Sequence, residues 1–283
     1  MTSVASGGYG SAMTSFVKLT GSGNDFIFID HRDGARGTEI DTDQIRALCA
    51  RGTGIGADGV VFFEEDPNAD VRIRYLNSDG SPAALCGNAT LCTVRLAHAL
   101  DIASPGSTLR IATDSGILRG RIVSGTPEFD VGRIERVTLS TGLACVDAEE
   151  VIGYALVGVP HFVVMVDDIE AVDVVGRGRA LRHHAWAGPP GANVNFVARD
   201  PRGGWSMRTY ERGVEGETLA CGTGAVAAAT LLLAWKQDAG PLVRIWTRSG
   251  QPVDVTVRRD NEQWAASLRG EGRIVFRGEL VDV

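Results

Sequence analysis

Two cysteine–glycine pairs, each followed by a long apolar run, constrain this chain more than any other feature. Cys86 and Gly87 precede apolar residues at helical spacing, and Cys221 and Gly222 precede an almost unbroken apolar run from residue 225 to residue 235. The two cysteines lie 135 residues apart, and each follows a polar segment of strand-like sequence. This repetition predicts two half-similar lobes, each with one thiol at the N-terminus of a helix.

The start of a helix is a distinctive chemical environment for a thiol. Backbone N–H groups of the first helical turn have no partner inside the helix and carry the positive end of its dipole, so they bind anions and favour a thiolate. The cysteine of a single Cys-Gly pair at a helix start is more often just a small, buried hydrophobic residue. Because the pair occurs twice, we expect a site where a carboxylate binds beside sulfur bases.

Length and charge narrow the class of protein. A chain of 283 residues is long for one core and suits two lobes of about 100–150 residues each. The net charge is −7 with no basic block, which argues against a nucleic acid or an anionic membrane as partner. No apolar run approaches the roughly 18 residues that span a bilayer, and no secretory signal is evident. We expect a soluble, cytoplasmic protein.

The cysteine pattern argues against a disulfide framework and against a metal site. The chain has five cysteines, an odd number, and no Cys-x-x-Cys pair. No group of histidines and cysteines has the spacing of zinc ligands, so we expect no bound metal. Cys49, Cys92 and Cys145 are expected to lie in the core.

The rest of the chain reads as short strands around one long helix in each lobe. Such a sequence lacks the repeating β-α-β pattern of a doubly wound sheet and indicates an α+β protein. Residues 1–13 are rich in glycine and serine and are expected to form a loose tail. Helices are expected from Asp41 or Thr42 to Ala50 and over 174–187, in addition to the two that follow the cysteines. Strands are expected at 16–19, 26–30, 60–63, 70–77, 151–159, 162–168, 192–197, 205–210 and within 243–280, and short strands between 108 and 139 with turns at 114–116, 125–127 and 132.

Seven blocks of sequence, in order, resemble the diaminopimelate epimerase family. They are GSGNDF at 21–26, GIGAD at 54–58, N-x-DGS at 77–81, CGN at 86–88, PH at 160–161, NVNF at 193–196, and ERG at 211–213 with GETLACGTG at 216–224. The resemblance implies two pseudo-symmetric α/β lobes, each a curved, mostly antiparallel sheet wrapped around a central helix, with the active site in the cleft between them. It implies a first lobe over 14–132, a second over 133–271, and a last strand, 272–283, that returns to the first lobe.

The reaction that the resemblance implies is the epimerisation of LL-diaminopimelate to meso-diaminopimelate, without pyridoxal phosphate, metal or any other cofactor. The α-proton of an amino acid is very weakly acidic, so a two-base site has to stabilise a carbanion-like transition state electrostatically. Two helix N-termini directed at one carboxylate would supply that field. One cysteine would remove the proton as a thiolate, while the other thiol returns a proton to the opposite face.

The resemblance also assigns roles to individual residues. Cys86 and Cys221 are the two bases, His161 is the partner of Cys86, and Glu211 is the partner of Cys221. The remaining substrate-binding residues are the amides that follow the cysteines and a polar group around the two ends of the substrate: Gly87, Asn88, Gly222, Thr223, Asn24, Asn77, Asn193 and Arg212. The expected partner is a small amino acid, and the family suggests a homodimer.

Three departures from the usual family pattern keep other functions open. Val159 precedes Pro-His where many members carry asparagine, residues 89–91 read Ala-Thr-Leu where Gly-x-Arg is usual, and the turn between Arg212 and Cys221 is one residue longer than the commonest form. The first alternative is therefore a cofactor-independent racemase of another amino acid, such as histidine. The alternative from a different class is a redox protein that uses Cys86 and Cys221 as a switchable disulfide.

Overall fold

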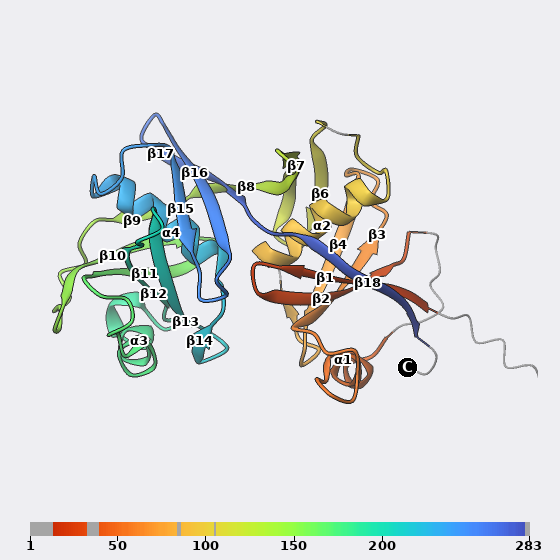
Figure 1. Cartoon of the computed structure of the whole chain (residues 1–283), viewed down its shortest axis with the longest axis horizontal. Coiled ribbons are helices and arrows are strands. Elements are labelled where there is room, and N and C mark those ends of the chain that lie inside the picture. The colour runs from red at the N-terminus through yellow and green to blue at the C-terminus, as the bar shows by residue number, and fades with distance from the viewer. Residues whose placement is uncertain (1–13, 33–39, 84–85, 105, 281–283) are drawn as a thin grey trace, which may run out of the picture.

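The computed structural model of the chain describes residues 14–32, 40–83, 86–104 and 106–280. The tail expected at 1–13 lies outside this range. Figure 1 shows two lobes side by side, with the first part of the chain in one and most of the later part in the other. Each lobe has a strand-rich layer, one central helix and one peripheral helix, which confirms the fold class expected from the sequence.

The main sheet of the first lobe has eight strands in its pairing order, and the first of them comes from the C-terminal part of the chain. Its pairing order is β18–β1–β2–β3–β4–β6–β7–β8, antiparallel except for β2 with β3 and β4 with β6. A short strand, β5, also pairs with β4. The bounds are β1 Thr14–Gly21, β2 Asn24–Asp30, β3 Gly59–Glu64, β4 Val71–Asn77, β5 Pro82–Ala83, β6 Leu109–Thr113, β7 Gly116–Val123, β8 Thr126–Ile134 and β18 Arg273–Leu280.

The second lobe repeats this arrangement strand for strand. Its order is β9–β10–β11–β12–β13–β15–β16–β17, with parallel pairs at β11 with β12 and β13 with β15, and the short β14 beside β13. The bounds are β9 Arg136–Thr138, β10 Glu149–Val157, β11 Val159–Val166, β12 Asn193–Arg199, β13 Trp205–Glu211, β14 Gly216–Thr218, β15 Leu242–Trp246, β16 Pro252–Asp260 and β17 Gln263–Arg269. The matching order of parallel and antiparallel pairs confirms the expected pseudo-symmetry.

Two strands connect the lobes. β8 pairs with β7 on one side and with β17 on the other, so it joins the two sheets. After β8 the chain enters the second lobe as β9, and after β17 it returns to the first lobe as β18, which pairs with β1 (Figure 1). The first strand in the order of each sheet, β18 or β9, is therefore formed by the segment that directly follows the last strand of the other lobe.

The two central helices, α2 (Gly87–Ala99) and α4 (Gly222–Ala234), are 13 residues long and largely buried. α4 is apolar on every side because strands of the second lobe surround it, and a helix that is hydrophobic all round belongs in a core. Leu91 of α2 packs with Phe129 and Leu268 in the core that surrounds α4, which links the two lobes. In the part of the chain that is described, no helix is long and apolar enough to cross a membrane.

The two peripheral helices, α1 (Thr42–Cys49) and α3 (Val174–Arg182), occupy matching places, between β2 and β3 and between β11 and β12. The sequence leaves Asp41 and Thr42 open as the cap of α1, and the structure shows that Asp41 caps it through a capping box with Gln44. The helix expected over 174–187 is shorter: α3 ends at Arg182, and a separate 3₁₀ turn, Ala185–Ala187, follows. That turn allows Trp186 to pack against Tyr154 and Phe162.

Two further expectations were wrong. Gly132 is no turn but lies inside β8 with φ of 89°, at a bulge where the register of β17 shifts between Ala266 and Ser267. Cys145 is exposed rather than in the core, since it lies in the irregular segment between β9 and β10. Cys49 and Cys92 are buried, as expected.

Candidate active site

Cys86 and Cys221 occupy equivalent positions at the starts of the two central helices. Each is the N-cap residue, with φ and ψ of −129° and 115° at Cys86 and −132° and 107° at Cys221. The helix N-termini meet between the lobes, because a Cβ at Gly87 would lie 3.8 Å from the Gly222 Cα and a Cβ at Gly222 would lie 3.8 Å from the Gly87 Cα. Both cysteines are free thiols. The two lobes thus bring one thiol each to a shared site.

Burial and helix amides act on these thiols in opposite directions. Burial raises the pKa of Cys86 to about 11, against the effect of backbone N–H groups of Ala89 and Asn88 that hydrogen-bond to the sulfur. Burial likewise raises the pKa of Cys221 to about 12, opposed by the backbone N–H of Gly224 and by the hydroxyl of Thr223 at 3.7 Å. Burial prevails at both sulfurs, so both thiols are protonated at neutral pH in the unliganded protein.

Glu211 adds a negative charge beside both thiols. It lies at the end of β13, and its Oε2 accepts a hydrogen bond of 2.7 Å from the Thr218 hydroxyl of β14. Burial raises the pKa of Glu211, while the Thr218 hydrogen bond lowers it. The charge of Glu211 raises the pKa of both Cys221 and Cys86.

His161 is a fully buried histidine in β11. Burial lowers its pKa to about 3, helped by the positive charge of Arg212, so the imidazole is neutral at physiological pH. Its Nδ1 lies 3.3 Å from Asn195 Nδ2, and its Nε2 has no hydrogen-bond partner among the described residues. A neutral imidazole can donate from one ring nitrogen and accept at the other.

Asn193 and Arg212 connect β12 to the turn after β13. Asn193 Oδ1 accepts a hydrogen bond of 2.8 Å from the Arg212 backbone N–H, and its Nδ2 donates to the Pro160 carbonyl at 3.3 Å. Within the described chain no carboxylate pairs with the Arg212 guanidinium. The Arg212 guanidinium is therefore a planar, permanently charged group that can bind a carboxylate through two hydrogen bonds.

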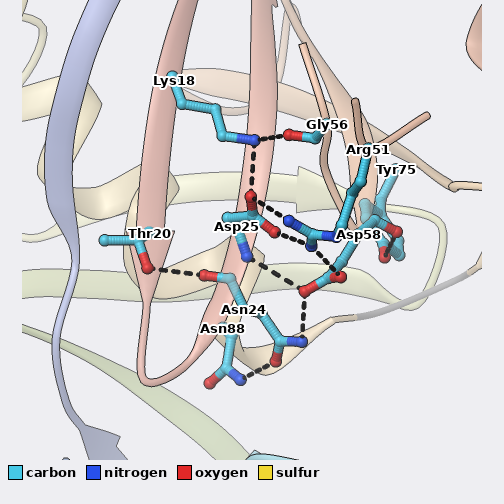
Figure 2. Close-up of polar contacts among 9 residues, drawn as sticks. All are labelled: Lys18, Thr20, Asn24, Asp25, Arg51, Gly56, Asp58, Tyr75 and Asn88. Carbon is cyan, nitrogen blue, oxygen red and sulfur yellow. Dashed lines mark hydrogen bonds and ion pairs between the residues drawn. The ribbon is translucent and has the colours of Figure 1, made fainter. Parts of the chain in front are cut away.

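A chain of hydrogen bonds fixes the orientation of two amides next to Cys86 (Figure 2). Asn24 Nδ2 donates to Asp58 Oδ2 at 2.8 Å, and Asn88 Nδ2 donates to Asn24 Oδ1 at 2.6 Å. Because an ionised carboxylate only accepts, Asp58 determines which end of Asn24 faces Asn88. Asn88 Oδ1 is then left buried and without a partner among the described residues. A Cβ at Gly222 would lie 3.9 Å from that oxygen, so it faces the start of α4.

Asp58 is itself held by a cluster of charges (Figure 2). Arg51 Nη2 pairs with Asp58 Oδ1 at 2.8 Å and with Asp25 Oδ1 at 2.6 Å, and the buried Lys18 pairs with Asp25 at 2.7 Å and also contacts the Gly56 carbonyl. Burial alone would raise the pKa of Asp25, but the hydrogen bonds from Arg51 and Lys18 lower it overall. Two cations thus balance two carboxylates behind the site.

Comparison with known proteins shows which family the chain belongs to. The family model of diaminopimelate epimerase matches residues 16–137 and 153–275. The chain belongs to the diaminopimelate epimerase family. A diaminopimelate epimerase of Gemmatimonas aurantiaca is 47% identical over 94% of this chain and 99% of that protein, and one of Aquifex aeolicus is 40% identical over 94% and 97%. Among solved structures, a phenazine biosynthesis protein of Bacillus anthracis shares the fold, with a TM-score of 0.75 at 17% identity over 95% of this chain and 99% of that chain.

Family members are isomerases. Asn24 contacts Asn88, Asn193 contacts Arg212, and Thr223 contacts Cys221. Among the described residues, no side-chain hydrogen bond joins His161 to Cys86 or Glu211 to Cys221. Asn77 is placed differently: its Nδ2 donates to Ser81 Oγ at 3.0 Å in the turn after β4. The described residues contain no group of three or more histidine, cysteine, aspartate or glutamate side chains that could hold a metal ion.

Four residues that support the site were not predicted from the sequence: Asp58, Asn195, Thr209 and Thr218. Asp58 and Asn195 lie in two of the seven family blocks, and each is a polar residue at or inside an apolar strand, which was a usable signal. Thr218 also lies in a family block, at 216–224, but threonine is common in strands, so its residue type gives no signal. Thr209 lies outside the blocks, and only its hydrogen bond reveals it.

The unusual segment Ala89-Thr90-Leu91 has a structural explanation. All three residues are fully buried, and the Thr90 hydroxyl donates to the Cys86 carbonyl at 2.9 Å. Leu91 belongs to the core between the lobes. This departure from the family pattern therefore alters packing behind the helix start. Val159, by contrast, is a partly buried residue at the first position of β11, before Pro160 and His161.

Proposed function

We propose that this chain epimerises LL-diaminopimelate to meso-diaminopimelate through its two thiols, without pyridoxal phosphate. The observation that carries the proposal is the matched pair of cysteine N-caps, one from each lobe, at helix N-termini that meet. Family membership over nearly the whole chain supports the substrate. No feature of the site favours histidine or a disulfide switch over this reading.

In the proposed reaction the substrate carboxylate binds to backbone amides at the starts of α2 and α4. These donors lie where negative charge develops as the α-proton leaves, so they stabilise the transition state more than the ground state. One cysteine, as thiolate, accepts the α-proton. The opposite thiol donates its proton to the other face of the carbon and becomes the thiolate, so each turnover exchanges the protonation states of Cys86 and Cys221.

Because both thiols are protonated in the unliganded protein, one of them has to release its proton to solvent as the substrate binds, which leaves the reactive thiolate. The substrate ammonium group supplies a positive charge to the site, and a nearby positive charge lowers the pKa of a thiol. We propose that His161 acts as the partner of Cys86 in the reaction and that Glu211 acts as the partner of Cys221. Asn24 and Asn88 would position the reacting end, and Asn77, Asn193 and Arg212 the distal amino and carboxylate groups.

We also propose that the protein is a cytoplasmic homodimer that serves lysine and peptidoglycan precursor synthesis. The pathway follows from the reaction. Support for a dimer comes from β18, which pairs with β1 alone among the described strands and exposes Val275 and Phe276. An unpaired strand edge with exposed apolar side chains is a surface that a second copy can cover.

The experiment that tests the reaction is α-proton exchange in D₂O, followed by NMR with reduced protein and no added cofactor. The substrates are LL-diaminopimelate and a panel of L-amino acids that includes histidine and arginine. We expect deuterium in diaminopimelate alone, and no epimerisation with Cys86→Ala or Cys221→Ala. Deuterium exchange only in another amino acid would refute diaminopimelate as the substrate but would leave Cys86 and Cys221 as the two bases. Wild-type rates in both cysteine variants would refute the assignment of Cys86 and Cys221 as the bases.

A further inference from the structure

Asn195 is a fully buried amide in the middle of β12, directly beside His161. Its Nδ2 lies 2.9 Å from the Phe162 carbonyl oxygen and 3.3 Å from His161 Nδ1. Its Oδ1 accepts a hydrogen bond of 3.0 Å from the Thr209 hydroxyl. A fully buried polar side chain whose amide oxygen and nitrogen are both engaged indicates a specific role.

These contacts fix which way the Asn195 amide points. A carbonyl oxygen only accepts hydrogen bonds, so the group 2.9 Å from the Phe162 oxygen has to be the NH₂. A flipped amide would place two oxygens in contact in a buried environment, which costs the full desolvation penalty of both. The Thr209 hydroxyl on the other side then donates to Oδ1.

The orientation of Asn195 determines the tautomer of His161. The NH₂ group has two hydrogens, of which one goes to Phe162 and the other faces His161 Nδ1. Nδ1 therefore accepts, and a neutral imidazole that accepts at Nδ1 carries its proton on Nε2. That Nε2–H is buried and has no partner among the described residues. It is a donor held ready for an acceptor that the unliganded protein does not provide.

We propose that Asn195 is a positioning residue that holds His161 as the neutral Nε2–H tautomer, so that His161 donates a hydrogen bond to an anionic group present only during the reaction. This inference rests on the proposed function, and the acceptor is a thiolate or a substrate carboxylate. The first turn of α4 also packs against Asn195. A side chain at Gly224 would collide with Asn195 Oδ1, and the Gly224 N–H binds the sulfur of Cys221.

The direct test is ¹⁵N NMR of the histidine rings in the unliganded, reduced wild-type protein. The chain has five histidines, and His161→Gln identifies the His161 signals by their loss. We expect the shift pattern of a neutral Nε2–H ring at neutral pH. A neutral Nδ1–H ring or an imidazolium would overturn the proposal. Because this measurement requires no turnover, its result is independent of whether diaminopimelate is the substrate.

The variant that tests Asn195 is Asn195→Asp, which keeps the shape but replaces the NH₂ donor by an acceptor. We expect His161 to carry a proton on Nδ1 in this variant, and kcat to fall by about 100-fold with a smaller change in KM, as for the loss of one donor to developing charge. Asn68→Asp places the same charge on an exposed turn and is expected to change neither quantity. A folded Asn195→Asp protein with wild-type His161 signals and wild-type kcat would overturn the proposal.

Addition of substrate identifies the acceptor. In wild-type protein we expect the Nε2 signal to shift when diaminopimelate binds, and the absence of any shift would overturn the donor role. If the shift persists in Cys86→Ala, the acceptor is a substrate carboxylate. If it disappears there, the acceptor is the Cys86 thiolate, and both results support the proposal.

Discussion

The chemistry of the two thiols depends on a balance between burial and hydrogen bonding at single sulfur atoms. Helix amides alone would favour the thiolate at Cys86 and Cys221, as the sequence suggests. Burial and the charge of Glu211 outweigh them and raise both pKa values well above that of an ordinary thiol. The protein therefore keeps its bases protonated until a substrate enters.

The first prediction concerns the pH dependence of alkylation. The pKa values of Cys86 and Cys221 are about 11 and about 12, so between neutral pH and about pH 9 the thiolate fraction rises about tenfold per pH unit. We expect the rates of iodoacetamide alkylation at both cysteines to rise by the same factor. Mass spectrometry of the two peptides measures each rate. A plateau near neutral pH would contradict the pKa values.

The second prediction concerns Glu211→Gln. Removal of this negative charge is expected to lower the pKa of both Cys221 and Cys86, because the charge of Glu211 raises both. We expect faster alkylation of Cys221 at neutral pH, measured by the same peptide analysis in the absence of substrate. Glu215→Gln removes an exposed charge from the same hairpin and serves as the matched control. Equal rates in the Glu211→Gln and Glu215→Gln proteins would refute the coupling.

At the scale of elements, the start of each central helix is the unit that carries the site. The helix supplies the amides, its N-cap residue is the cysteine, and glycine permits close approach by residues from other strands. Asn24 reaches Asn88 from the β1–β2 hairpin, and Asn195 reaches Gly224 from β12. A helix start without these contacts would bind an anion but would not orient it.

The third prediction concerns Gly224→Ala in the first turn of α4. The added Cβ would collide with Asn195 Oδ1 and lie 3.2 Å from the Cys221 sulfur. Overpacking of this kind costs about 1–3 kcal/mol of unfolding free energy, and displacement of Asn195 should also lower kcat. Urea unfolding and steady-state kinetics measure the two effects. In the control Gly216→Ala, the Cβ would meet no described atom within 4 Å, and a stability loss equal to that of Gly224→Ala would contradict the packing argument.

At the scale of the whole molecule, the exchange of outer strands ties the two lobes into one unit. β8 pairs with both sheets, and β18 closes the first lobe only after the second has been completed. The site lies where α2 and α4 meet, so it requires both lobes in their correct relative position. The same topology leaves one edge of β18 without a partner among the described strands.

The fourth prediction concerns Phe276→Glu on β18. Phe276 is 45% exposed and packs edge-on against Phe16, at 5.8 Å between ring centroids. If this edge forms the proposed dimer, a buried charge there should disrupt it. We expect light scattering to give twice the chain mass of 30.0 kDa for the wild type and the chain mass for Phe276→Glu. Ile117→Glu on β7, at a similarly exposed position, is the control. A dimer that survives Phe276→Glu would place the interface elsewhere.

The sequence alone determined the local structure, the two-lobe organisation and the family. Helix starts at the Cys-Gly pairs, the Asp41 cap and most strands follow from neighbours in the chain, because propensity, capping and alternation act over a few residues. The tertiary structure decided the rest. The hydrogen bonds that orient Asn24 and His161 join residues 64 and 34 positions apart, to Asn88 and Asn195, and no local pattern encodes such distances. The protonation of both thiols and of His161 depends on burial, which exists only once the two lobes have folded around the site.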